Sequence, residues 1–216
     1  MTIIKHFFRA PTAANLRHAK FGPQALAYRL NQVLNSLLGV DQFGFVPGQD
    51  IRHALCYFYD LMNHCRRNNA SGPIGAICLD FAKDFDSVNW QALDLLQFSS
   101  LHYDFFRGIL VQDLANSSRS DSFKLGAGVR QADPLSPGLF VLFIEPFICY
   151  LRATNDGMAI KIHDTSHHLL SFADNGSGLV NDLTHAPRFL ARVNDFCTAT
   201  VMRLNVDKTV LFPFLG

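Results

Sequence analysis

The chain has 216 residues, of which 49% are hydrophobic and only 17% are charged, a composition that excludes intrinsic disorder, a coiled coil and a collagen-like fibre. The net charge is +1, but residues 1–40 carry five basic side chains (Lys and Arg) and no acidic one. We therefore expect a basic N-terminal arm that contacts phosphates, although an ordinary solvent-exposed basic helix accounts for the same charges.

Three features bear on the compartment. The longest apolar run, Leu139–Leu151, contains Glu145 and Pro146 and predicts a buried helix rather than a membrane span. Residues 1–11 lack the small-residue cleavage site of a signal peptide, and the five cysteines form no C-x-x-C pair. We expect an intracellular protein, nuclear or cytoplasmic, with no membrane partner; the oligomeric state stays open.

In the first part of the chain, apolar residues at helical spacing predict a helix over 23–39 that stops at Gly39. Asp50 is expected to cap a second helix. A short buried strand is expected over 73–80. The expected inward face of the second helix consists of Ile51, Leu55, Phe58, Leu61 and Met62.

Further along, helices are expected over 89–97 and 103–116, and another is expected to begin after Pro137. The pattern then predicts a hairpin over 159–172 that turns near 164–166, a last helix over 184–198 and a strand over 209–212. Helices and strands mix without strict βαβ alternation, which favours the α+β class.

Two carboxylates each close an apolar run: Asp80 follows 76–79 and Asp174 follows 169–173. An ionised aspartate there is unfavourable unless it is paired or holds a metal. If the two strand ends lie side by side, both carboxylates can hold divalent cations for phosphoryl or nucleotidyl transfer. For either aspartate taken alone, a turn-forming role at a strand end is the commoner explanation, so spacing by itself favours that role over a metal site.

Five short motifs occur in order along the chain. They are Gly44–Gln49 (GFVPGQ), Leu79–Asp86 (LDFAKDFD), Gly128–Pro137 (GVRQADPLSP), Phe172–Asn175 (FADN) and Leu204–Thr209 (LNVDKT). Together they resemble the fingers and palm motifs of reverse transcriptases of non-LTR (LINE-like) retrotransposons.

The resemblance implies a right-hand polymerase palm over residues 73–216, an antiparallel sheet backed by helices, and a partial fingers region over 1–72. Because the chain ends eight residues after Lys208, no thumb is expected. The implied activity is RNA-directed DNA polymerisation, in which dNTPs extend a primer on an RNA or DNA template. The implied cofactor is a pair of Mg²⁺ ions, with Mn²⁺ as an alternative.

By resemblance, Asp80 and Asp174 are catalytic metal ligands, joined by Asn175 and by the backbone carbonyl of Phe81. Lys208 is implied to approach the leaving pyrophosphate; a solvated lysine is the competing interpretation.

The implied nucleotide-binding residues are Phe81, Phe85, Gln131 and Ala132. The bulky ring of Phe85 is expected to exclude a 2′-hydroxyl and so select dNTPs. Weaker candidates for nucleic-acid contacts are Arg9, Lys20, Arg29 and Arg52.

The chain also departs from the family pattern. Ala132 replaces a glycine, Asn175 replaces a second aspartate, and Gln49 replaces an arginine, although Arg52 lies one helical turn away. Asp84 replaces an alanine, and one hypothesis is that it substitutes for the carboxylate missing at 175. The competing function is therefore a catalytically inactive retroelement remnant, at most a weak nucleic-acid-binding domain.

A third candidate, a metal phosphodiesterase, is disfavoured because no further acidic or histidine cluster accompanies Asp80 and Asp174 in the sequence. His163, His167 and His168 are expected to be surface histidines of a hairpin loop rather than metal ligands.

Overall fold

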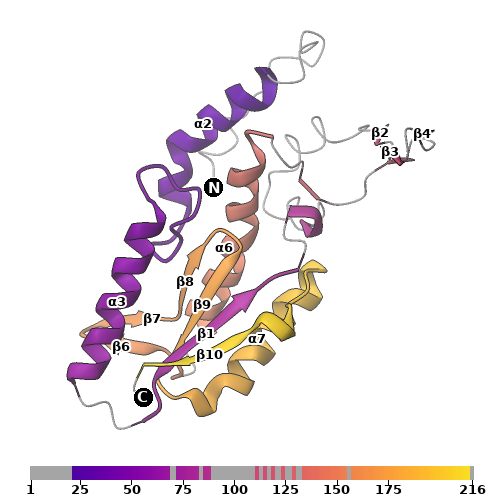
Figure 1. Cartoon of the computed structure of the whole chain (residues 1–216). Helices are drawn as coiled ribbons and strands as arrows, with labels where there is room; N and C mark the ends of the chain where they lie inside the picture. Colours follow the sequence, from indigo (N-terminus) through magenta and orange to yellow (C-terminus); the bar gives the residue numbers. More distant parts are fainter. Residues whose placement is uncertain are drawn as a thin grey trace.

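The computed structural model describes residues 21–68, 72–82, 85–88, 128–129, 133–154 and 157–214, together with four two-residue strands between 110 and 124 (Figure 1). Its centre is a four-stranded antiparallel sheet with the strand order β10-β1-β9-β8. These strands are β1 (Gly75–Asp80), β8 (Leu169–Phe172), β9 (Asn175–Val180) and β10 (Val210–Pro213).

Four long helices surround this sheet: α2 (Phe21–Leu37), α3 (Ile51–Arg67), α6 (Ser136–Thr154) and α7 (Ala186–Thr200). A separate hairpin pairs β6 (Ile160–Ile162) with β7 (Thr165–His167). Two further pairs of short strands form: β2 (Leu110–Val111) with β5 (Phe123–Lys124), and β3 (Leu114–Ala115) with β4 (Ser118–Arg119). Single 3-10 turns make up η2 (Phe85–Ser87), η3 (Leu183–His185) and η4 (Val206–Lys208).

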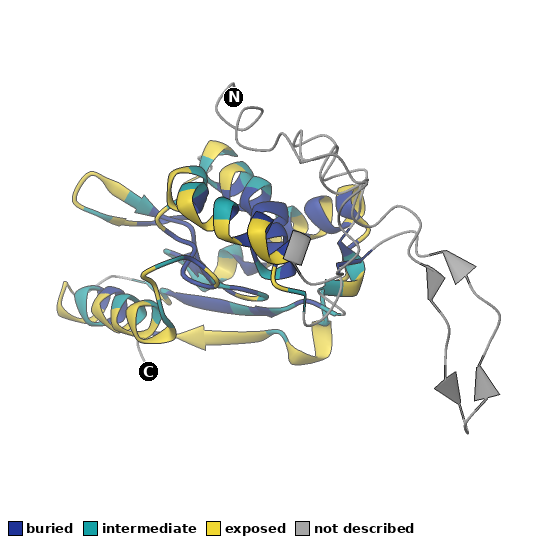
Figure 2. Ribbon diagram, turned by 90° about the horizontal axis from the view of Figure 1, so that it is seen from above, coloured by how far each residue is buried: buried dark blue, intermediate teal, exposed yellow. Residues whose placement is uncertain are grey.

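The two faces of the sheet bury different sets of side chains, because successive residues of a strand point to opposite faces. Ile77 and Leu79 of β1 join the larger cluster, which includes buried residues of α2, α6 and α7. Ala76 joins the smaller cluster, with Leu61 and Met62 of α3. Figure 2 shows the buried residues gathered between the helices and the sheet.

Helix α6 is the apolar centre of the larger cluster. Its composition and length would suit a membrane span, but 61% of its most apolar stretch is buried inside the fold. On β9, Gly178 allows α7 to approach closely, because a Cβ at this position would overlap the ring of Phe189.

Most of the elements expected from the sequence are confirmed. Asp50 caps α3 by accepting hydrogen bonds from the backbone N–H groups of Arg52 (2.8 Å) and His53 (3.3 Å). The helices expected over 23–39, after Pro137 and over 184–198, and the strands over 73–80 and 209–212, form within two residues of their predicted bounds. The α+β class and the antiparallel palm sheet are also confirmed.

Two expectations are wrong in part. Ile51 and Leu55 are 52% and 58% exposed, because the first turns of α3 face an open groove and only its later turns reach the core.

The expected helix over 103–116 contains β2 and β3, where pairing with residues 118–124 overrides the helical pattern. The expected helix over 89–97 lies outside the described residues.

The hairpin expected over 159–172 is confirmed in its first part and wrong in its second. The chain turns at His163 and Asp164, since Ile162 pairs with Thr165 and His163 has a φ of +52°. The segment after the turn is then divided: β7 pairs with β6, whereas β8 joins the main sheet beside β9.

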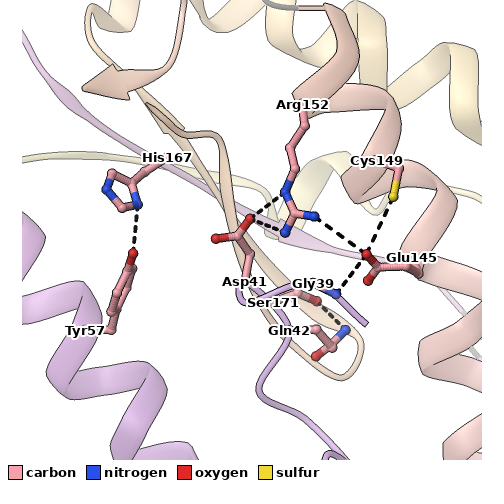
Figure 3. A network of polar contacts seen from close by, with 9 residues as sticks. All are labelled: Gly39, Asp41, Gln42, Tyr57, Glu145, Cys149, Arg152, His167 and Ser171. Carbon is pink, nitrogen blue, oxygen red and sulfur yellow. Dashed lines mark hydrogen bonds and ion pairs between the residues drawn. The ribbon is translucent and has the colours of Figure 1, made fainter. Parts of the chain in front are cut away.

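The loop between α2 and α3 is fixed by a buried ion pair (Figure 3). Asp41, which is only 4% exposed, accepts a hydrogen bond from Arg152 Nε at 2.9 Å and a second from Nη2. Arg152 extends from α6 and also lies 3.7 Å from Glu145 Oε1, which accepts the N–H of Gly39 at 3.0 Å. The pair therefore ties the loop to the core helix.

Removal of the guanidinium in Arg152→Met leaves the Asp41 carboxylate buried without its partner. We expect this change to lower the free energy of unfolding by about 3–5 kcal/mol, measured by urea denaturation. The matched control is Arg52→Met, because the Arg52–Asp50 pair is exposed and should contribute less than about 1 kcal/mol. Equal losses in the two variants would contradict a structural role for the buried pair.

Candidate active site

Asp80 and the hairpin turn that carries Asp174 meet at one edge of the sheet. Asp80 is the last residue of β1, and its register partner on β9 is Asn175. Partners in register share a face, and alternation places Asp80, Cys78 and Ala76 on the α3 side of the sheet. The two strands that the carboxylates follow, β1 and β8, finish at the same end of the sheet with β9 between them, so Asp174 approaches Asp80 through the turn into β9.

Asp174 lies in the two-residue turn between β8 and β9, which the pair Phe172 and Asn175 closes. Ala173, the other turn residue, has a φ of +58°, in the left-handed region that favours glycine. Asn175 Nδ2 donates a hydrogen bond to Asp174 Oδ1 at 3.2 Å. The turn thus brings both FADN polar side chains to the end of β1.

Lys208 lies just before β10, the edge strand on the other side of β1, and its side chain points to Asp80. The N–H of Asn205 donates to the Asp80 carbonyl at 2.8 Å, and Leu204 forms a bridge with Phe81. The chain then turns through η4, so that Lys208 Nζ lies 3.4 Å from Asp80 Oδ2. Of the predicted catalytic residues, Lys208 therefore contacts the Asp80 carboxylate, and Asn175 lies beside Asp80 as its register partner.

The two phenylalanines of the LDFAKDFD motif differ in their surroundings. Phe81 is buried and packs edge-on against Phe147, with ring centroids 6.4 Å apart. Phe85 stacks on Phe140 at 5.0 Å and meets Phe45 edge-on at 6.2 Å. Phe85 is half-buried, with one face of its ring backed by the core helix α6.

Backbone hydrogen bonds connect this segment to the start of the GVRQADPLSP motif. The N–H of Val129 donates to the Phe85 carbonyl at 2.7 Å, and the N–H of Gly128 donates to the Val88 carbonyl at 2.9 Å. Residues 128–129, which lie just before the motif's predicted nucleotide-binding pair, are therefore bonded to the segment around Phe85. That pair itself, Gln131 and Ala132, lies outside the described residues, as do Arg9, Lys20 and Asp84.

Two of the residues expected to contact phosphates, Arg29 and Arg52, lie in the described part of the chain. Arg29 is half-buried on α2. Arg52 donates from Nε to Asp50 Oδ2 at 3.0 Å, and this exposed pair holds the pKa of Asp50 at about 2. The charge of Arg52 is therefore engaged at the helix cap.

The expectation of surface histidines is wrong for His167 and His168, which are 7% and 9% exposed. Tyr57 Oη lies at hydrogen-bonding distance, 2.8 Å, from His167 Nδ1, and burial lowers the pKa of this histidine (Figure 3). The short β7 strand turns this side chain inward, toward α3, which the loop interpretation did not allow for.

Sequence reasoning missed Gln42, which is 2% exposed and contacts the turn that carries Asp174. Its Oε1 accepts the N–H of Gly44 at 2.9 Å and the N–H of Ala173 at 3.3 Å. The available signal was weak: a polar pair, Asp41 and Gln42, directly before an apolar, glycine-containing motif.

A groove of about 410 Å³ opens on the same face of the sheet as Asp80. The exposed turns of α3 form one wall, through Ile51 and Leu55. Cys78 and Ser177 belong to its sheet side, and it extends to Asn175. The face that presents Asp80 is thus open where the opposite face is core.

The residues at this edge fit a divalent metal ion. Asp80 and Asp174 supply carboxylate oxygens, and Asn175 supplies an amide oxygen, the ligand class that Mg²⁺ prefers. The Asp80 side chain is 30% exposed, so a hydrated ion can reach it. Within the described residues, no group of three His, Cys, Asp or Glu side chains forms an alternative metal cluster.

Comparisons with known proteins agree with this geometry. Residues 20–216 match the model of the family described as "Reverse transcriptase (RNA-dependent DNA polymerase)". The chain is 32% identical over 199 residues to the transposon TX1 uncharacterized 149 kDa protein of Xenopus laevis, covering 88% of this chain and 15% of that protein. It is 29% identical over 143 residues to the Pol polyprotein of the type-1 retrotransposable element R2 of Popillia japonica, covering 62% and 20% respectively.

Solved structures show the same fold. Apo telomerase from Candida tropicalis superposes with a TM-score of 0.61 at 12% identity, over 87% of this chain and 37% of that one. Telomerase from the same organism in complex with a fragment of telomeric RNA gives 0.61 at 13% identity, over 87% and 33%. The chain therefore spans about a third of each structure and less than a quarter of each sequence relative.

The variant Asn175→Asp tests whether the turn at 174–175 binds a divalent metal ion. The new carboxylate removes the hydrogen bond to Asp174 and adds a like charge, so we expect a loss of about 1 kcal/mol of stability without metal. With Mg²⁺ or Mn²⁺ in excess, we expect a larger rise in Tm than in the wild type. The control is Asn181→Asp, just beyond the opposite end of β9, which should show no extra metal response. Equal responses would contradict a metal site at 174–175.

Proposed function

This chain belongs to the reverse transcriptase (RNA-dependent DNA polymerase) family, and from that premise we propose that it extends a primer 3′-hydroxyl with dNTPs on a nucleic-acid template. The observation that carries the proposal is the meeting of Asp80, Asn175 and Lys208 at one sheet edge, with Lys208 Nζ 3.4 Å from Asp80 Oδ2. Asp174, next to Asn175 in the turn between β8 and β9, adds the second carboxylate, and two carboxylates that can hold divalent ions are what nucleotidyl transfer uses.

In the proposed site, Asp80 and Asp174 would hold two Mg²⁺ ions, with the Asn175 amide oxygen and the Phe81 carbonyl as further ligands. Such ions would supply positive charge to the triphosphate and lower the pKa of the primer hydroxyl. The protein supplies the rigid placement: β1 fixes Asp80, and the closed turn between β8 and β9 fixes Asp174.

Lys208 is proposed to stabilise the leaving pyrophosphate. Its side chain is 68% exposed, so it can leave Asp80 when cations and substrate arrive. An ammonium group near the departing phosphate offsets the negative charge that develops in the transition state. Asn205 anchors the short turn that holds Lys208, since its N–H bonds the Asp80 carbonyl.

Phe85 is proposed to select the sugar. Its ring is stacked on Phe140, so one side is supported by the core and the ring cannot retreat from a substrate. A supported ring beside the ribose leaves no room for a 2′-hydroxyl, whereas a 2′-deoxyribose fits. Gln131 and Ala132 are proposed to complete the nucleotide pocket.

The proposed partners are a template and its primer, with residues 1–72 as fingers and 73–216 as palm. A telomerase of the same fold has been solved with a fragment of telomeric RNA, which supports nucleic acid as the class of partner. Arg9, Lys20 and Arg29 are proposed to contact phosphates, whereas Arg52 is already paired with Asp50.

Incorporation of dTTP on oligo(dT)–poly(rA), with Mg²⁺ and then Mn²⁺, tests the activity. We expect Asp80→Asn to lower incorporation by at least about a hundredfold and Lys208→Ala to lower kcat by about tenfold or more. The control is Asp164→Asn in the β6–β7 turn, which should not change the rate.

Wild-type incorporation that survives Asp80→Asn would refute this site. Absence of incorporation in the wild type, with activity in the double variant Ala132→Gly and Asn175→Asp, would instead support the inactive remnant. The two changes restore the family residues at two positions where the chain departs from the motifs.

Phe85→Val tests sugar selection. The smaller side chain opens space beside the ribose, so we expect the preference for dNTPs over rNTPs, measured as the ratio of kcat/KM values, to fall by about tenfold or more. The control is Phe212→Val, which removes an aromatic ring from the groove on the same sheet face. An unchanged ratio in Phe85→Val would contradict the role of Phe85.

A further inference from the structure

We infer that Gln42 and Gly44, in the loop between α2 and α3, are positioning residues that hold the turn carrying Asp174. The inference rests on the proposed function only for its effect on polymerisation, because the contact itself can be measured in the free protein. Neither residue contacts the reacting atoms; both act on the backbone of Ala173.

Gln42 uses both ends of its amide on this turn. Oε1 accepts the N–H of Ala173 at 3.3 Å, and Nε2 donates to Ser171 Oγ at 3.1 Å. Ser171 Oγ in turn donates to the Ala173 carbonyl at 3.3 Å. The backbone groups on both sides of Ala173 are therefore bonded, directly or through one hydroxyl, to a side chain that is 2% exposed.

Gly44 closes the same contact by its lack of a side chain. An added Cβ would overlap the backbone nitrogen of Ala173 and lie 2.8 Å from its Cα. Gly44 also donates its N–H to Gln42 Oε1 at 2.9 Å, which fixes the glutamine amide. The glycine of the GFVPGQ motif is thus explained by the close approach of two backbones.

The Ala173 backbone needs such support. A non-glycine residue in the left-handed region is disfavoured by about 1–2 kcal/mol, and Ala173 has a φ of +58°. Asp174 follows it directly, so any relaxation of Ala173 would redirect the carboxylate. Catalytic geometry tolerates displacements of only about 0.5 Å, so a relaxed turn would weaken both metal binding and turnover.

The loop is itself docked along β8, independently of the Gln42 side chain. Ser171 donates its N–H to the Asp41 carbonyl at 2.8 Å, and Phe43 donates its N–H to the Ser171 carbonyl at 2.8 Å. The Asp41 charge is neutralised by Arg152, so the loop brings a neutral acceptor, not a further anion, to the acidic turn. A glutamine suits this position because it accepts an N–H without repelling Asp174.

The test compares Gln42→Met and Gly44→Ala with the control Gly48→Ala. Gly48 belongs to the same motif, but an added Cβ there would have no neighbour within 4 Å. The alanine would be strained only by the backbone φ of +82° and would not touch the turn. The first measurement is amide hydrogen exchange at 172–175, with Ile77 in β1 as an internal reference for global opening. The second is the affinity for Mn²⁺ alone, by electron paramagnetic resonance.

In both test variants we expect exchange at Ala173 to accelerate by about tenfold or more relative to Ile77, and Mn²⁺ affinity to fall by about threefold or more. In an active protein, kcat should fall while the KM for dTTP stays within about twofold. Gly48→Ala should change neither the exchange ratio nor the Mn²⁺ affinity. Ser171→Ala, which keeps both Oε1 contacts, should give a smaller acceleration and serves if Gln42→Met fails to fold.

Unchanged exchange at Ala173 in Gly44→Ala and in Gln42→Met, or in Ser171→Ala where the latter does not fold, would overturn the inference, whatever the polymerase activity. Accelerated exchange and weaker Mn²⁺ binding in a protein that incorporates no dTTP would uphold the inference and count against the proposed function. The two failures are therefore distinguishable.

Discussion

The buried pair between Asp41 and Arg152 is the constraint on which the placement of the Asp174 turn depends. It fastens the loop between α2 and α3 to α6, and the loop backbone then lies along β8. Nearby, burial raises the pKa of Glu145, and among the described residues its Oε2 has no hydrogen-bond partner. A buried network with an unsatisfied oxygen is a poor source of net stability. Its contacts instead fix the loop at three of its residues, Gly39, Asp41 and Gln42.

The two faces of the sheet differ: one packs against the core helices, and the other carries the candidate site. On one face, Ile77 and Leu79 pack into the cluster with α6 and α7, and Gly178 of β9 lets α7 approach closely. On the other face, the same alternation presents Asp80 and Asn175 beside an open groove. Because β1 and β9 are antiparallel, the end of one strand meets the turn that begins the other. A residue of β1 thus meets a turn almost a hundred positions later in the chain.

The sequence predicted the features that local patterns determine. Asp50 caps α3, and β1 ends at Asp80. The resemblance, rather than a local pattern, pointed to Asn175 and Lys208, and both lie beside Asp80. Sequence reasoning failed where burial depends on a distant partner. Ile51 and Leu55 have the spacing of a core face, but an open groove lies between them and the sheet. His167 is buried because β7 turns it toward Tyr57, and Gln42 acts on a turn 131 residues away. No periodicity encodes such contacts.

The charges at the site also explain why it can accept a cation. Two carboxylates stand at the edge, and each already has a partner: Asp80 has Lys208, and Asp174 has the Asn175 amide. Both partners are exposed, and exposed pairs of this kind contribute only about 0–1 kcal/mol. A divalent ion can therefore displace them at little cost, while Arg152 remains bound to the buried Asp41. The exchangeable pairs lie where the chemistry is proposed, and the fixed pair lies where the loop is anchored.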